Sequence, residues 1–398
     1  MKKNALVISL VSIIGLSVYI SNSIFVSKDK NTASQNNNST LALYIENEGG
    51  EYKPSSDEYF PKEGYVLNLD KSSCKNGGIL SQDPDTKTIN LSASASDQCS
   101  VYFECERYAT KTLANSLKVY GDTANTYNFC SRTEMYVFIH EATTQTPAQT
   151  DYRYIGNTPN NYVTFNGETW RIIGVFETEN SAGKTEQRIK IVRQETLGDL
   201  AWNSNKSSEW STASLKTLLN GDYYNRTGDY ANSGLSEESR KMIDPAKWYL
   251  GGSGANPSTA QLAYSFERGE KTYKNSRTTN IIQNVGLIYP SDYIYTYANG
   301  VNEKCYTDAY NCNKGTPASG WIFNMFGGKV QWTTAPVTGY SDSVFFVGPT
   351  GYFNSNFNGS SGWANVTNAH GVHPVVYLKS SIKLVGGDGT QSNPYILG

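Results

Sequence analysis

The most apolar stretch of the chain lies at its N-terminus. Residues 5–20 are almost all apolar, follow two lysines, and are extended by the apolar residues 24–26. A helix over residues 5–26 is about 33 Å long, enough to cross a bilayer core of about 30 Å. The pattern predicts a single-pass membrane anchor over residues 1–27, with the rest of the chain outside the cell. A cleaved signal peptide is the alternative, although the best match to a cleavage site, at residues 20–23, is poor.

The following segment changes from a polar stretch to short apolar runs. Residues 28–40 are polar apart from Ala33, which predicts a solvated stalk. Short alternating runs separated by turn residues then predict a small all-β module over residues 41–104. Its strands are expected at 41–45, 64–69, 88–91 and 99–103. A module of this size has a thin core, so we expect a disulfide to support it.

Residues 105–150 are predicted to connect this module to a second domain. Leu113, Leu117 and Tyr120 recur at helical spacing and predict a short amphipathic helix over residues 110–120. The polar residues 142–150 are expected to form the last hinge.

The remaining residues, 151–398, predict a loop-rich α+β domain. Asn166 and Gly167 separate two apolar runs at 162–165 and 168–176, which is typical of a β-hairpin with a type I′ turn. Many glycines and long loops surround the other short elements. These are expected as strands at 188–193, 285–289, 343–347, 351–354 and 375–378, and as helices at 214–220, 236–243 and 259–268, with Ser236 as an N-cap.

Composition narrows the functional classes. The 398 residues are 13% aromatic and 18% charged, which excludes wholesale disorder. The net charge is −2, and it becomes −5 when the four lysines and one aspartate of residues 1–30 are set aside. A mildly acidic exported chain is not a nucleic-acid binder.

Six cysteines in an exported chain indicate disulfides. Proximity in the sequence favours one of 15 possible connectivities, in which Cys74 pairs with Cys99, Cys105 with Cys130, and Cys305 with Cys312. A metal site is the weaker interpretation, because the chain has no C-x-x-C pair and its histidines lie far from its cysteines. We predict no metal and no cofactor.

Several motifs of the second domain occur in a known order. They are residues 152–154 and 160–163, the Trp-Arg-Ile-Ile-Gly-Val-Phe run at 170–176, and residues 210–220, 286–293, 332–334, 371–378 and 386–395. In this order they resemble a family of uncharacterised exported proteins of low-GC Gram-positive gut bacteria. The C-terminal domain of that family looks like the formylglycine-generating-enzyme (sulfatase-modifying-factor) branch of the C-type-lectin-like fold. Residues 59–65 and Cys74 also look like a β module that precedes this domain in related proteins.

The resemblance implies a fold and a surface location rather than a reaction. His373 stands where the family usually has arginine, so one hydrogen-bond donor replaces five and the local packing is in doubt. Formylglycine-generating chemistry would need two cysteines that bind a soft metal. Cys305 and Cys312 are the candidates in this domain, and their spacing is more simply that of a stapled loop.

Other catalytic sites are not supported by the sequence. There is no G-x-S-x-G nucleophile motif, and the glycines at 251–254 lack the lysine of a phosphate-binding loop. His370 and His373 are expected on opposite sides of a strand. Residues 386–393 lack the spaced carboxylates of a calcium loop. We therefore predict that the protein is not an enzyme.

The remaining functional feature is the segment 339–367. It is rich in tyrosine, tryptophan and asparagine, which suit the recognition of sugars or protein surfaces. The candidate ligand-binding residues are Tyr340, Asp342, Tyr352, Asn354, Asn356, Asn358, Trp363 and Asn365. Aromatic residues that fill a loop-rich core are the competing interpretation.

The sequence as a whole predicts non-catalytic adhesion to a glycan or protein on a host or neighbouring cell. A structural or assembly component of the cell envelope is the alternative, and an oxidoreductase of the formylglycine-generating type is the third.

Overall fold

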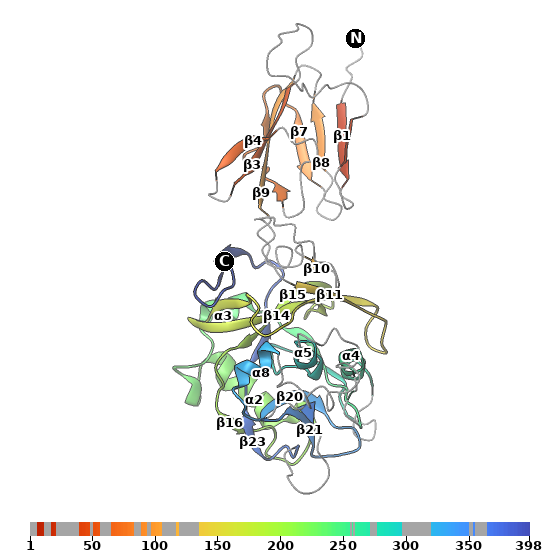
Figure 1. Cartoon of the computed structure of the whole chain (residues 1–398), viewed down its shortest axis with the longest axis vertical. Helices are drawn as coiled ribbons and strands as arrows, with labels where there is room; N and C mark the ends of the chain where they lie inside the picture. Colours follow the sequence, from red (N-terminus) through yellow and green to blue (C-terminus); the bar gives the residue numbers. More distant parts are fainter. Residues whose placement is uncertain are drawn as a thin grey trace. The chain divides into compact units, whose positions relative to one another are not determined.

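The computed structural model divides the chain into two compact units (Figure 1). Unit 1 comprises residues 1–107 and 126–132, and unit 2 comprises residues 108–125 and 133–398. The structure describes residues 6–11, 17–20, 40–47, 51–55, 65–82, 89–93, 97–105, 117–118, 135–254, 257, 259–270, 277–296, 320–349, 353–354 and 364–398. Strands outnumber helices, and unit 2 contains both, so the chain is an α+β protein.

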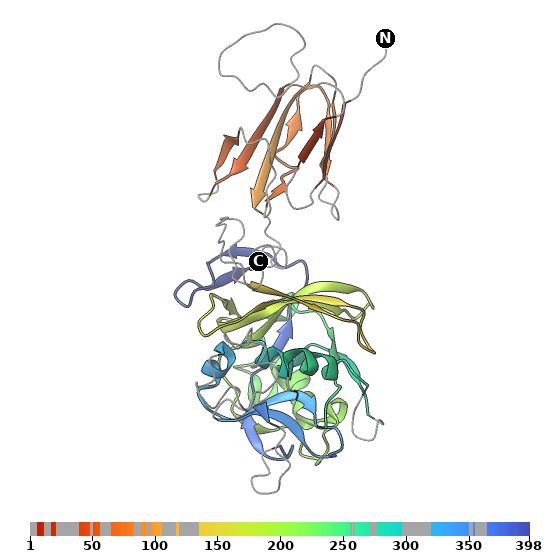
Figure 2. The same ribbon diagram turned by 45° about the vertical axis from the view of Figure 1, so that its right-hand side comes forward.

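The described part of unit 1 consists of two β-sheets (Figure 2). One has the strand order β2-β1-β8-β7, and the other has the order β4-β3-β9-β5 with β6 also paired to β9. Cys99, Val101 and Phe103 alternate along β9 and are buried, as the period of two along a strand requires. The strands are β1 (Leu6–Val11), β2 (Ser17–Ile20), β3 (Thr40–Glu46), β4 (Tyr52–Ser55), β5 (Tyr65–Leu67), β6 (Ser73–Cys74), β7 (Ile79–Gln82), β8 (Ile89–Ala93) and β9 (Gln98–Cys105). The four strands expected between residues 41 and 104 are confirmed as β3, β5, β8 and β9.

The described parts of the N-terminal apolar run, Leu6–Val11 and Ser17–Ile20, form strands where a helix was expected. β1 and β2 pair antiparallel with each other, and β1 also pairs with β8. Valine and isoleucine recur in both segments, and β-branched residues fit a pleated sheet well. No helix in the described part of the chain is long and apolar enough to cross a bilayer. The membrane anchor stays a prediction.

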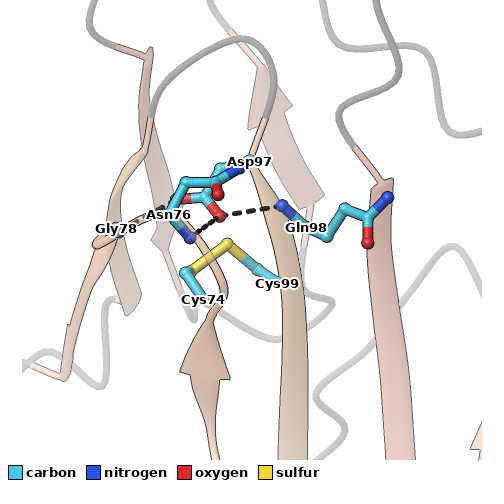
Figure 3. The surroundings of a disulfide bond; sticks show 6 residues. All are labelled: Cys74, Asn76, Gly78, Asp97, Gln98 and Cys99. Atoms are coloured by element: carbon cyan, nitrogen blue, oxygen red, sulfur yellow. Dashed lines mark hydrogen bonds between the residues drawn. A yellow bond between two sulfur atoms is a disulfide. The ribbon is translucent and has the colours of Figure 1, made fainter.

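A disulfide joins β6 to β9 (Figure 3). Cys74 and Cys99 are opposite residues of this antiparallel pair, with Cα atoms 4.0 Å apart. The buried carboxylate of Asp97 lies beside them and accepts hydrogen bonds from backbone N–H groups, including those of Asn76 and Gly78. The predicted pairing of Cys74 with Cys99 is confirmed.

The other cysteines are only partly placed. Cys105 is disulfide-bonded, while its expected partner Cys130 and the expected pair Cys305 and Cys312 lie outside the described residues. Within the described ranges, one group of side chains has donor atoms close enough to hold a metal ion. It consists of the two bonded cysteines and Asp97, so its sulfur atoms are already used in the disulfide.

A ten-stranded sheet runs through unit 2. Its strand order is β10-β11-β12-β14-β13-β26-β25, and β15, β24 and β19 extend it from β14. Ile189 and Ile191 of β15 face one hydrophobic core, whereas Lys190 and Val192 face the other, so both faces of this strand are buried. The strands are β10 (Leu117–Lys118), β11 (Met135–His140), β12 (Gln149–Tyr154), β13 (Tyr162–Phe165), β14 (Glu168–Glu179), β15 (Thr185–Arg193), β19 (Val285–Gly286), β24 (Val375–Tyr377), β25 (Leu384–Gly386) and β26 (Tyr395–Leu397).

Two smaller sheets and several short helices complete the described part of unit 2. The five-stranded sheet contains β16 (Asp199–Ala201), β20 (Gln331–Pro336), β21 (Val344–Val347), β22 (Phe353–Asn354) and β23 (Ala369–Gly371), and the two-stranded sheet contains β17 (Ala246–Tyr249) and β18 (Asn280–Gln283). The helices are η1 (Trp210–Thr212), α2 (Ser214–Leu218), η2 (Leu219–Tyr223), η3 (Gly228–Tyr230), α3 (Glu237–Met242), α4 (Ala260–Glu267), α5 (Pro290–Ile294) and α8 (Trp321–Phe326). Helices α4 and α5 lie side by side (Figure 1).

The predicted hairpin is confirmed as β13 and β14. Asn166 and Gly167 have φ angles of 58° and 71°, the left-handed backbone that a type I′ turn requires at both central residues. The Asn166 side chain also accepts a hydrogen bond from the backbone N–H of Ser236, at 2.7 Å. Ser236 in turn caps α3 through the N–H of Ser239, as the sequence predicted.

The helix expected over residues 110–120 is not found at its described residues. Leu117 and Lys118 form strand β10, which pairs parallel with β11. Leu113 and Leu117 are four residues apart, and this spacing places two side chains on one face of a helix and of a strand alike. The polar stretch expected as a hinge leads from β11 into β12, whose first residue is Gln149.

Candidate functional site

The candidate segment 339–367 begins at a tight turn between β20 and β21. The N–H of Val337 donates to Ser343 O at 3.0 Å, and the N–H of Tyr340 donates to Val337 O at 3.3 Å. Gly339 has a φ of 93°, a conformation that glycine adopts without strain. The turn presents Tyr340 to solvent with 43% of its surface exposed.

Asp342 and Asn365 hold the two ends of the segment together. The side-chain amide of Asn365 donates to Asp342 Oδ2 at 3.1 Å, and the N–H of Val366 donates to Asp342 O at 2.9 Å. The Oδ1 atom of Asn365 accepts hydrogen bonds from both the N–H and the hydroxyl of Thr367. Two of the predicted ligand-binding residues therefore stabilise the loop itself.

A second set of contacts fixes the turn from outside the segment. The Ser208 N–H donates to Ser341 O at 2.7 Å, and its hydroxyl donates to Tyr340 O at 3.1 Å. Arg277 donates to Ser341 O at 2.9 Å and to the Ser208 hydroxyl at 2.5 Å. A shallow concavity lies alongside, lined by Ser208, Glu209, Trp210, Leu250, Arg277, Thr278 and Pro336. Sequence reasoning missed Ser208 and Arg277, since nothing in their local pattern links them to the turn.

The remaining predicted residues of the segment are only partly placed. Asn354 belongs to the short strand β22, which pairs with β21. Tyr352, Asn356, Asn358 and Trp363 lie outside the described residues. Of the eight candidates, the structure therefore brings together Tyr340, Asp342 and Asn365.

The two histidines of the motif at 370–373 have different surroundings. His370 packs against the Trp332 ring, with centroids 4.3 Å apart. His373 is buried, and its Nδ1 lies 3.0 Å from the backbone oxygen of Arg193, to which it donates. Burial lowers the pKa of His373 to about 4, so its ring is neutral at physiological pH. The single N–H of the neutral His373 ring therefore meets one backbone carbonyl.

Charged side chains gather inside unit 2, where the sequence analysis expected no site. We call the following seven residues the buried ionic cluster: His140, Asp151, Arg153, Lys190, Glu267, Arg268 and Asp292. They come from β11, β12, β15, α4 with its C-cap, and α5, and each is at most 3% exposed.

Arg153 bridges two carboxylates at the centre of the cluster. Its Nη2 donates to Asp151 Oδ2 at 2.8 Å and its Nη1 donates to Asp292 Oδ1 at 3.1 Å. His140 Nε2 lies 3.0 Å from Asp151 Oδ2, and Lys190 Nζ donates to Asp292 Oδ2. Each buried carboxylate of this pair thus has two cationic or imidazole partners, which is how buried charges are tolerated.

Glu267 and Arg268 form the other end of the cluster. The Glu267 carboxylate accepts hydrogen bonds from the N–H and the hydroxyl of Ser291, at 2.7 and 2.6 Å, and contacts Arg268 Nη1 at 3.3 Å. The Tyr264 ring stacks on His140 with centroids 3.6 Å apart, and the Arg268 guanidinium carbon lies 3.5 Å from its centroid. Tyr264 thus connects the two ends of the cluster.

Burial and charge pairing shift the pKa values of these groups in opposite directions. Burial alone would raise the pKa of Asp151, but Arg153 and His140 lower it to about 2. Burial raises the pKa of Glu267 to about 7, since Arg268 and Ser291 offset it only in part. Burial likewise lowers the pKa of Lys190 to about 8, against the opposing effect of Asp292. Lys190 and Glu267 therefore change charge within reach of neutral pH.

An open depression of about 600 Å³ lies near one end of this cluster. The described residues that line it are Thr144, Gly252, Ser265, Phe266, Gly269, Glu270 and Thr279. None of them belongs to the buried ionic cluster, so the depression and the titratable groups are separate features.

No family model, no curated protein and no solved structure matches the chain. The resemblance to the formylglycine-generating branch stays a prediction, and the functional argument rests on the geometry of the site.

Proposed function

We propose that the chain is a single-pass, membrane-anchored surface protein that binds a glycan or a protein on a host or neighbouring cell without catalysing a reaction. The observation that carries this proposal is the tethered turn at Tyr340. The aromatic ring is 43% exposed, while the backbone around it is held by Ser208, Arg277 and the Asp342 to Asn365 contact. A tyrosine on a rigid support offers a large contact area at little cost in conformational entropy.

The proposal assigns residues 151–398 to the C-type-lectin-like fold. An α+β arrangement of short elements joined by long loops is compatible with this assignment. Loops commonly carry the ligand in lectin-like folds, and the tethered turn at Tyr340 lies in such a connection, between β20 and β21.

The location of the ionisable residues supports a binding role. In the described part of unit 2, seven acids and bases form the buried ionic cluster, where they pair with one another and hold β12, β15 and α5 together. At the exposed turn, the charged Arg277 and Asp342 make hydrogen bonds to the loop itself, and the neighbouring hydroxyl, amide and phenol groups are of kinds that contact sugars and peptides.

Tyr340→Ala tests the proposal. We expect the full-length protein to bind purified glycans, protein arrays and whole cells, and the variant to bind its ligand roughly tenfold more weakly, or about 1.4 kcal/mol. Ile282→Ala is the matched control, because Ile282 is also 43% exposed but lies in β18. Equal affinity of the wild type and Tyr340→Ala, or binding to none of the probes, would contradict the proposal.

A structural or assembly role in the cell envelope is a second candidate, and one surface favours it. Val385 and Ile396 are 57% and 50% exposed on the adjacent strands β25 and β26, at one end of the ten-stranded sheet. An exposed apolar pair at a sheet edge can pair with another chain. If this role is correct, Val385→Lys lowers the oligomer mass measured by sedimentation and leaves ligand binding unchanged. A monomeric wild type would rule it out.

A further inference from the structure

We propose that Lys190 and Asp292 join through an intramolecular amide bond, which makes the interior of unit 2 a site of spontaneous covalent cross-linking. The two side chains are in direct contact, and each is 0% exposed. Lys190 lies on β15, and Asp292 lies in the first turn of α5, 102 positions further along the chain. This inference goes beyond the proposed function and does not depend on it.

The burial of this pair sets it apart from the other lysine pairs in the described residues. Lys241 and Glu237 are 69% and 67% exposed, and Lys247 and Glu179 are 19% and 32% exposed. In water, hydration favours the separate ammonium and carboxylate ions over an amide. Lys190 and Asp292 lack this hydration, and burying two charges is costly even when they are paired. Condensation removes both charges from the interior and releases a water molecule.

Burial favours the neutral, nucleophilic form of Lys190, against the attraction of aromatic ring faces and Asp292 for its ammonium. Its Nζ lies 4.1 Å from the centroid of the Tyr289 ring, and the rings of Trp248, Phe176 and Tyr377 lie at 5.3 to 5.4 Å. Burial lowers the pKa of Lys190 to about 8, so a part of the population is unprotonated near neutral pH.

The groups around Asp292 fit the reaction. The Lys190 ammonium passes one proton to Oδ2, and the resulting amine attacks Cγ of the carboxylic acid. Arg153 Nη1, 3.1 Å from Oδ1, stabilises the negative charge that develops on that oxygen. The second proton from Nζ completes the departing water, which takes Oδ2, and the third stays on the amide nitrogen. One C–N bond forms, one C–O bond breaks, and no oxidant or reductant is required.

The interior stays electrically balanced after the reaction. Arg153 keeps its contact with Asp151, and Arg268 keeps its contact with Glu267. Glu267 interacts electrostatically with both Lys190 and Asp292, and its pKa of about 7 allows it to exchange a proton at neutral pH. The remaining oxygen, Oδ1, continues to accept a hydrogen bond from Arg153.

The mass of the wild-type protein tests the inference. After purification, reduction, alkylation and denaturation, we expect the intact chain to be one water molecule lighter than its sequence. Trypsin cannot cleave after an acylated lysine, so the digest should contain residues 189–193 joined to residues 278–304. An intact chain of full mass, whose digest is cleaved after Lys190 and contains residues 278–304 unlinked even after prolonged incubation at pH 8, would overturn the inference.

Two variants distinguish this bond from other dehydrations. Lys190→Arg keeps the buried positive charge but cannot form the amide, so its chain should have the full mass. Asp292→Asn should release ammonia instead of water and give the same cross-linked product as the wild type. A loss of water that persists in Lys190→Arg would come from elsewhere in the chain and would refute the proposal. The wild-type peptide map decides the question even if a variant fails to fold.

Discussion

Replacing Asp151 by asparagine removes one charge from the buried ionic cluster and keeps the shape of the side chain. Asp151 is 1% exposed and contacts both Arg153 Nη2 and His140 Nε2. The asparagine can still accept a hydrogen bond from Arg153, but it removes the ion pair with Asp151, which the guanidinium keeps in the wild type whether or not Asp292 is cross-linked. Breaking a buried ion pair from one side costs about 3 kcal/mol or more, so we expect unit 2 to lose about that much stability at pH 7.

The pKa of Asp151 fixes how this loss depends on pH. The folded state holds the pKa at about 2, below its ordinary value of 3.8, so the carboxylate favours folding when it is ionised. The contribution is complete above the unfolded pKa and disappears as the pH falls through the folded one. A difference of about 1.8 pKa units corresponds to about 2.4 kcal/mol. The gap between the wild type and Asp151→Asn should therefore narrow by about 2 kcal/mol between pH 5 and pH 2, with the remainder lost below pH 2.

Urea unfolding followed by tryptophan fluorescence measures this difference. All seven tryptophans lie within the residues of unit 2, so the signal reports on that unit. Glu237→Gln is the matched control, because Glu237 forms an ion pair with Lys241 that is exposed to solvent and screened by it. A loss for Asp151→Asn no larger than that of the control, or a gap that stays constant with pH, would refute the reasoning.

Two further predictions concern the other buried acid and the disulfide. The folded pKa of Glu267 is about 7, above its ordinary 4.5, so its contribution to stability is complete below pH 4.5 and is lost as the pH rises through 7. The wild type should therefore lose about 2.6 kcal/mol between pH 4.5 and pH 7, and Glu267→Gln should remove this slope in the same unfolding assay. An unchanged slope would contradict it. The double change Cys74→Ser and Cys99→Ser opens a loop with a sequence separation of 25 and should lower the stability of unit 1 by about 3.5 kcal/mol. Amide hydrogen exchange along β9 should then be faster, while the urea midpoint of the tryptophan fluorescence of unit 2 should not change. Unchanged exchange along β9 would contradict this prediction.

Local sequence patterns were sufficient to predict those elements whose structure is determined by neighbouring residues. The hairpin at residues 162–176 follows from Asn166 and Gly167, which accept a positive φ. The N-cap at Ser236 and the pairing of Cys74 with Cys99 also depend on residues close together in the sequence. In each case a short segment contains both the signal and its partner.

Long-range contacts explain what the sequence could not predict. Arg188 and Lys190 alternate with isoleucines, a pattern typical of a strand with one solvated face, yet both side chains are fully buried. Their carboxylate partners Asp244 and Asp292 lie 56 and 102 positions away. The strand at Leu117 was missed for a related reason, since its pairing with Met135 is tertiary. The sequence pattern points to the turn at Tyr340 as a candidate, whereas its anchor Arg277 has no local signal.

The parallel pairing of β13 with β26 bears on how unit 2 reaches its structure. Val163 lies opposite Tyr395, so two neighbouring strands of one sheet come from near the two ends of the unit's sequence. Contacts between distant positions are slow to form, because the loop between them must be closed before they contribute any stability. We therefore expect unit 2 to fold slowly and as a whole. Until the sheet is complete, its unpaired strand edges can aggregate, and we expect chaperones to limit this aggregation.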